Sequence, residues 1–136
     1  MKIAVRYFTR TGNTKKLADA VAKAAGVEAL PISEPIGDDV DALFLASSVY
    51  AAGVAGDVKK FIKSIDVQVG EVVNISSAAI IESTYAQIKG LVENQGMKMS
   101  DKEYHCRGAF TMLHRGRPNQ DDIQGVTDFT KTYLAK

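Results

Sequence analysis

The stretch "KIAVRYFTRTGNTKKLADAVAKAAG", residues 2–26, decides the fold. Its first seven residues, "KIAVRYF", are typical of a strand. Apolar residues then recur at helical spacing over 13–25, and Gly26 follows as a helix stop. The loop between the two segments, Thr9 to Thr14, is built from small and polar residues. We therefore predict a strand, a polar loop and a helix in direct succession.

Strand-like and helix-like segments alternate along the rest of the chain. Apolar or β-branched runs predict further strands at residues 27–32, 41–49, 71–76 and 102–110. Helical spacing predicts helices at about 55–65, at about 83–94 and from about 120 onward. The run over 41–49 is continuously apolar, as expected of a strand that is covered on both faces.

Strands that alternate with helices form parallel sheets through right-handed crossovers. We predict an α/β protein with a three-layer, doubly wound, five-stranded parallel sheet in the order 2-1-3-4-5. In such sheets, ligands bind outside the carboxyl ends of the strands at the switch point, here between strands one and three. The polar loop after strand one and the segment "SSVYAAG", residues 47–53, both fall at that point.

The composition is that of an ordinary globular protein, and 136 residues fit a single domain over 1–136. A net charge of +1 gives no case for nucleic acid as a partner. One cysteine excludes an intrachain disulfide, and no run approaches the roughly 20 apolar residues of a membrane span. The N-terminal apolar run is short and interrupted by charges, unlike a signal peptide. We expect a cytoplasmic monomer or weak dimer.

The polar loop suits an anion. The helix that follows it begins with unpaired N–H groups and the positive end of its dipole. Gly12 allows close approach of the backbone, and the hydroxyls of Thr9, Thr11 and Thr14 can donate hydrogen bonds to oxygens. The alternative is that these residues only cap the helix and hold no ligand.

Other phosphate-binding motifs are absent. Gly12 has no partner that would complete a Walker loop or a G-x-G-x-x-G fingerprint. The strands that end at Thr9 and at Ser47–Ser48 lack the acidic residues of a receiver domain. Cys106 lies within a predicted strand, where no glycine-rich anion cradle follows it as in a cysteine phosphatase.

The segment "TRTGNT" resembles the phosphate-binding loop of the flavodoxin family, [ST]-x-[ST]-G-x-[ST], which holds the 5′-phosphate of FMN. The resemblance continues through "DALFLASSVYAAGVAGDVKKFI" and "CRGAFTMLHRGRPNQDDI" and so extends along the whole chain. The fifth strand is uninterrupted, as in short-chain members of that family.

The resemblance implies that FMN is the cofactor, and it assigns binding residues. The phosphate would be held by Thr9, Arg10, Thr11, Gly12, Asn13 and Thr14. One side of the isoalloxazine ring would be lined by Ser47, Ser48, Val49, Tyr50, Ala51, Ala52 and Gly53. The other side would be approached by the loop after strand four, with Ser76, Ser77, Ala78 and Ala79. Tyr50 is the best aromatic candidate for stacking, the alternative being a surface tyrosine.

The chain departs from the family pattern in two respects. The segment "SSAAIIES" has no large aromatic residue, so one flavin face would be open or filled by Ile80 or Ile81. Many flavodoxins are strongly acidic, and this chain is nearly neutral. His114, Arg115 and Arg117 either form a solvated basic loop or contact a substrate or a nucleotide phosphate.

Three functions remain open. The first is one-electron transfer by bound FMN to a redox partner protein. The second is a small FMN-dependent NAD(P)H:quinone-type reductase with a small-molecule acceptor, and the third is a flavin-free interaction module. The short chain favours the first over the second, while an open flavin face and the basic loop favour the second.

Overall fold

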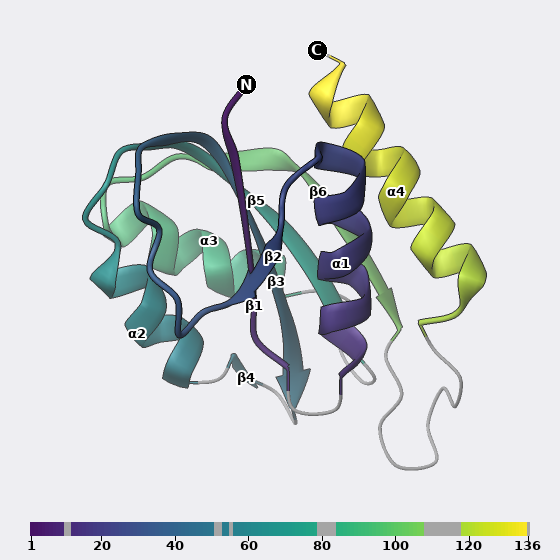
Figure 1. Cartoon of the computed structure of the whole chain (residues 1–136). Coiled ribbons are helices and arrows are strands. Elements are labelled where there is room, and N and C mark those ends of the chain that lie inside the picture. Colours follow the sequence, from purple (N-terminus) through teal and green to yellow (C-terminus); the bar gives the residue numbers. More distant parts are fainter. Residues whose placement is uncertain (10–11, 51–52, 55, 79–83, 108–117, 136) are drawn as a thin grey trace.

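A strand whose middle part is buried on both faces forms the centre of the computed structural model (Figure 1). The structure describes residues 1–9, 12–50, 53–54, 56–78, 84–107 and 118–135. This strand is β3, Val40–Tyr50, in which residues 42–45 have no solvent exposure. Successive side chains of a strand point to opposite faces, so a run that is buried throughout must be covered on both. The prediction for this segment is confirmed.

The elements follow the predicted alternation. In chain order they are β1 (Ile3–Tyr7), α1 (Asn13–Ala25), β2 (Ala29–Pro31), β3 (Val40–Tyr50), β4 (Gly53–Val54), α2 (Gly56–Ser64), β5 (Val69–Ala78), α3 (Tyr85–Asn94), β6 (Met99–Arg107) and α4 (Gln120–Leu134). The parallel strands lie in the order β2-β1-β3-β5-β6, which is the predicted order 2-1-3-4-5. The fold prediction is therefore confirmed.

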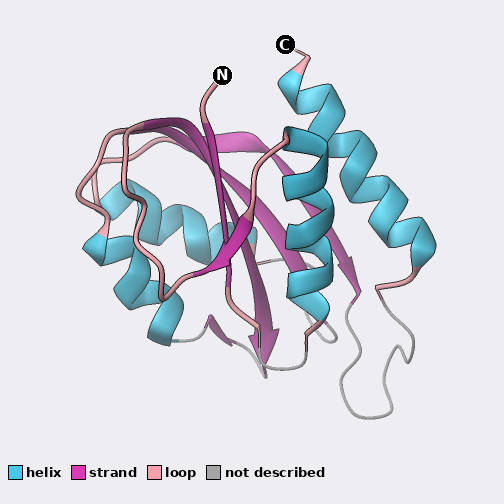
Figure 2. Cartoon of the chain, in the orientation of Figure 1, coloured by secondary structure: helices cyan, strands magenta, loops and turns pink. Residues whose placement is uncertain are grey.

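The helices complete three layers (Figure 2), with α1 and α4 on one face of the sheet and α2 and α3 on the other. Ala42, Phe44 and Ala46 of β3 belong to the core beneath α1 and α4. Leu43 and Leu45 belong to the core beneath α2 and α3. No helix in the described part of the chain has the length and apolar character needed to span a bilayer.

The structure corrects the predicted strand ends. It adds β4, which pairs antiparallel with the end of β3 and which no sequence pattern indicated. It also extends β5 as far as Ala78, so Ser76, Ser77 and Ala78 are strand residues and the prediction of a loop there is wrong. The additional backbone pairing with β3, from Ser47–Ser76 to Val49–Ala78, accounts for the longer strand.

Arg6 is a charged residue within a central strand, and its side chain is only 7% exposed. Its guanidinium donates to the carbonyls of Glu34 (2.9 Å), Pro35 (2.9 Å) and Val5 (3.0 Å). Burial lowers the pKa of Arg6, and the carboxylate of Glu34 partly opposes this shift. The required partners are thus backbone oxygens, which tie the segment after β2 to β1.

We predict that Arg6→Met lowers the free energy of unfolding by about 2–4 kcal/mol, because several carbonyls lose their donor. The measurement is urea denaturation followed by circular dichroism. Lys2→Met is the control, since Lys2 directly precedes β1 and pairs with Asp38 at the exposed surface. Equal denaturation midpoints for Arg6→Met and the wild type would contradict a stabilising role of these bonds.

Candidate functional site

The polar residues predicted to bind a ligand, as far as the structure describes them, lie at one edge of the sheet. Strand β1 pairs with β3 through Tyr7 and Ala46, and the N–H of Phe8 donates to the Ala46 carbonyl at 3.0 Å. Strand β3 pairs in turn with β5 through Ser47 and Ser76. Because parallel strands end at the same edge, Thr9 lies beside the ends of β3 and β5.

The loop after β1 turns sharply into α1. Gly12 has φ of 88°, in the left-handed region, and a Cβ at this position would meet no atom within 4 Å. The Oγ1 of Thr9 accepts a hydrogen bond from the Gly12 N–H at 2.9 Å, which closes the turn. Arg10 and Thr11 lie outside the described residues. Glycine is thus required here for its backbone conformation, while the space beside it stays open.

Within the described residues, the start of α1 has neither a side-chain cap nor an acidic residue in its first turn. Its N-cap residue is Gly12, which has no side chain to cap the helix. Helix α4 differs, because Asn119 and Asp122 form a reciprocal capping box with bonds of 2.8 and 3.0 Å. The N–H groups and dipole at the start of α1 therefore favour an anion from outside the helix.

Thr14 is the second residue of α1. Its side chain is fully buried, and its Oγ1 lies 3.4 Å from the Oγ of Ser77, which is 1% exposed. That separation is longer than the usual 2.7–2.8 Å of a hydroxyl pair, so the contact is weak. Asn13, the first residue of α1, is also buried. The structure thus brings together Thr9, Gly12, Asn13, Thr14 and Ser77 around the start of α1.

Ser47 and Ser76 point to the opposite face of the sheet. Both are fully buried, together with Asn74 and Thr84. The Oγ1 of Thr84 lies 3.3 Å from the Oγ of Ser47 and 3.0 Å from the Nδ2 of Asn74. The N–H of Thr84 donates to the Oγ of Ser76 at 3.4 Å. These two serine side chains therefore hold the start of α3 against β3 and β5.

The remaining predicted residues divide into two groups. Ser48, Val49, Tyr50, Gly53 and Ala78 belong to strands, and Tyr50 pairs with Gly53 in the β3–β4 hairpin. Outside the described residues lie Ala51, Ala52, Ala79, Ile80, Ile81, His114, Arg115 and Arg117.

Sequence reasoning missed Asn74 and Thr84. A polar residue inside the buried strand "EVVNIS" was a signal, because a fully buried amide needs a hydrogen-bond partner. The pattern could not identify Thr84 as that partner.

Comparison with known proteins identifies the family. The family model of the flavodoxin domain matches residues 4–101. The chain belongs to the flavodoxin family. The resemblance noted from the sequence is thereby confirmed. No curated protein sequence matches the chain significantly.

Solved flavodoxin structures share the fold over nearly the full length of both chains. A flavodoxin from the domain Archaea has a TM-score of 0.81 at 17% identity, covering 99% of this chain and 97% of that chain. Flavodoxin 2 from Bacillus cereus has a TM-score of 0.70 at 14% identity, covering 99% of each chain. A flavodoxin of Streptococcus pneumonia TIGR4 has a TM-score of 0.68 at 14% identity, covering 98% of this chain and 97% of that chain. At these identities the likeness shows the fold alone.

We predict that Thr84→Val lowers the free energy of unfolding by about 1–3 kcal/mol, because Asn74 and Ser47 lose a buried partner while the side-chain volume is unchanged. The measurement is chemical denaturation. Thr132→Val is the control, since Thr132 is an exposed threonine within a helix. If the two variants were equally stable, the contacts of Thr84 would not contribute to holding α3.

Proposed function

We propose that this flavodoxin binds FMN at the carboxyl edge of β1, β3 and β5 and acts in electron transfer. The observation that carries the proposal is the uncapped start of α1, beside the left-handed Gly12 and the hydroxyls of Thr9 and Thr14. A terminal phosphate dianion suits this arrangement because it accepts several N–H and O–H bonds and interacts favourably with the helix dipole.

The residues present fit the phosphate end of the cofactor. The open space at Gly12 leaves room for close approach of a phosphate oxygen. Thr14 is positioned within the first turn of α1, and among the described residues its hydroxyl makes a weak contact with Ser77. Thr11 and Arg10, from the same loop, would complete the binding residues. FMN bound there would supply one-electron and two-electron chemistry, while the protein binds and orients it.

The walls of the proposed ring site would come from two neighbouring strand ends. The β3–β4 hairpin, with Ser48, Val49, Tyr50 and Gly53, would provide one wall. Ser77 and Ala78 at the end of β5, with Ala79 beyond it, would provide the other. Ser47 and Ser76 would act indirectly, because their side chains are bonded to Thr84 beneath the edge.

Electron transfer to a partner protein is favoured over a self-contained reductase. All helices and parallel strands in the described part of the chain are used in building the three layers, and only the short β4 lies outside the parallel sheet. Such a chain has little structure left for a substrate domain. Steady oxidation of NADH or NADPH by the FMN-loaded protein would instead support the reductase.

We predict that Thr14→Val weakens FMN binding by about tenfold or more and riboflavin binding much less, because only FMN carries the phosphate. Thr11→Ala should act in the same direction. Isothermal titration calorimetry measures both ligands. Thr130→Val is the control, since Thr130 is another fully buried threonine whose hydroxyl bonds within its own helix, to Val126. Equal weakening of FMN and riboflavin would remove the phosphate assignment.

We predict that adding the second electron to bound FMN is less unfavourable than in a strongly acidic flavodoxin. Added negative charge is opposed by acidic side chains, and this chain has a net charge of +1, with Arg10, Arg115 and Arg117 expected at the rim of the ligand site. Redox titration at low and high salt measures the potentials, and salt should reduce the effect of exposed charges. A second-electron potential far below that of free FMN would contradict the expectation.

A further inference from the structure

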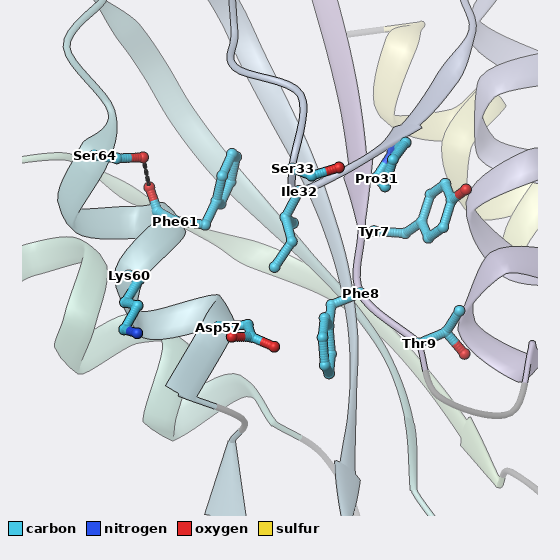
Figure 3. Close-up of a pocket in the computed structure, with 10 residues that line it drawn as sticks. All are labelled: Tyr7, Phe8, Thr9, Pro31, Ile32, Ser33, Asp57, Lys60, Phe61 and Ser64. Carbon is cyan, nitrogen blue, oxygen red and sulfur yellow. Dashed lines mark hydrogen bonds between the residues drawn. The ribbon is translucent and has the colours of Figure 1, made fainter.

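A cavity lies beside Thr9, on the face of the sheet that α2 and α3 cover. It has a volume of about 530 Å³ and opens between the end of β1, the segment after β2 and helix α2 (Figure 3). Thr9 belongs to its lining and also closes the turn at Gly12. The volume falls within the range of about 300–1,000 Å³ that is typical of small-molecule sites.

Helix α2 presents one continuous side to the cavity. Its lining residues Asp57, Lys60, Phe61 and Ser64 are three or four positions apart, which places them on one face of a helix. Lys59 and Lys63 belong to the same helix but do not line the cavity. Of the lysines of α2, Lys60 therefore lines the cavity.

The wall opposite α2 is fixed by hydrogen bonds. The N–H of Ile32 donates to the Tyr7 carbonyl at 3.0 Å, and Arg6 holds the carbonyls of Glu34 and Pro35 at 2.9 Å each. Ile32 and Ser33 line the cavity directly in front of these anchored residues. The cavity is therefore built into the fold before any ligand arrives.

The lining combines an apolar surface with one group of each charge. Phe8, Ile32 and Phe61 supply the apolar part, and Figure 3 shows their side chains grouped around the centre of the cavity. In the same view the carboxylate of Asp57 points toward Phe8, and Lys60 lies beyond it on α2. A purely apolar ligand would use neither charge, and a simple aromatic acid could accept from Lys60 but would offer no donor to Asp57.

We propose that this cavity binds an adenosine 5′-phosphate group. The planar base would pack on Phe8, Ile32 and Phe61, as bases do on aromatic side chains. Ribose hydroxyls or the exocyclic amino group would donate to Asp57, and the phosphate would accept from Lys60. This ligand class satisfies the apolar surface and both charges together, and it needs no bound flavin.

The test uses AMP, adenosine and inorganic phosphate as probes, titrated into the protein with and without FMN and followed by amide NMR shifts. AMP is expected to bind about fivefold more tightly than adenosine, because one lysine contact is gained at a solvent-exposed site. Lys60→Gln should remove that difference, and Lys59→Gln, the neighbouring exposed lysine, should retain it.

A second variant tests whether the adenine base packs on Phe8. Phe8→Leu should weaken AMP and adenosine by the same factor, about tenfold, because it removes the aromatic face but not the lysine. No AMP binding at millimolar concentration, equal effects of Lys59→Gln and Lys60→Gln, or an unchanged affinity of Phe8→Leu would each overturn the proposal. Failure of FMN binding would leave it standing, since AMP is titrated without flavin as well.

The same titrations identify the source of the adenylate group. If it belongs to FAD, FAD binds more tightly than FMN, and Lys60→Gln weakens only FAD. If it belongs to a nicotinamide dinucleotide, NADH displaces AMP from the FMN-loaded protein. If it is free AMP, neither dinucleotide displaces it.

Discussion

The parallel pairing of β3 with both β1 and β5 is the constraint on which the rest of the structure depends. Because β3 is buried on both faces, helices must cover the sheet on two sides, and each crossover returns the chain in the same direction. The carboxyl ends of the strands then emerge at one edge, where the following helices begin. Polar loop residues and unpaired helix N–H groups accumulate there as a consequence of topology.

Below that edge, short polar side chains are buried on both faces of the sheet. On one face Thr14 of α1 meets Ser77 of β5, and on the other Thr84, at the start of α3, meets Asn74 and Ser47. Buried polar groups are costly unless they are hydrogen-bonded, so these contacts restrict how each helix start can sit on the strands. The helix starts at this edge are therefore fixed in position, although the side chains that hold them are mostly small serines and threonines.

At the proposed phosphate site the positive polarity would come from local geometry, since the chain is almost neutral overall. Helix α4 satisfies its own start with a capping box, whereas α1 begins at a glycine and has no acid in its first turn. Arg6 acts differently, because its guanidinium donates to the backbone carbonyls of Glu34 and Pro35. These bonds fix the chain segment that forms one wall of the neighbouring cavity. The positive end of α1 would thus serve ligand binding, whereas the positive charge of Arg6 serves the structure of the neighbouring chain segment.

The sequence by itself predicted the alternation of strands and helices, because strand and helix periodicity are local properties of the chain. The strand order, which the structure confirms, came from the kind of sheet that such an alternation builds and from the family that the chain resembles. Tertiary structure alone decided the β3–β4 hairpin, the continuation of β5 through Ser76 and Ser77, and the pairing of Asn74 with Thr84. It also decided that Phe8, Ile32 and Phe61 enclose one cavity. The partner of a buried polar group and the shape of a concave surface depend on the register and packing of segments distant in sequence, which no local pattern records.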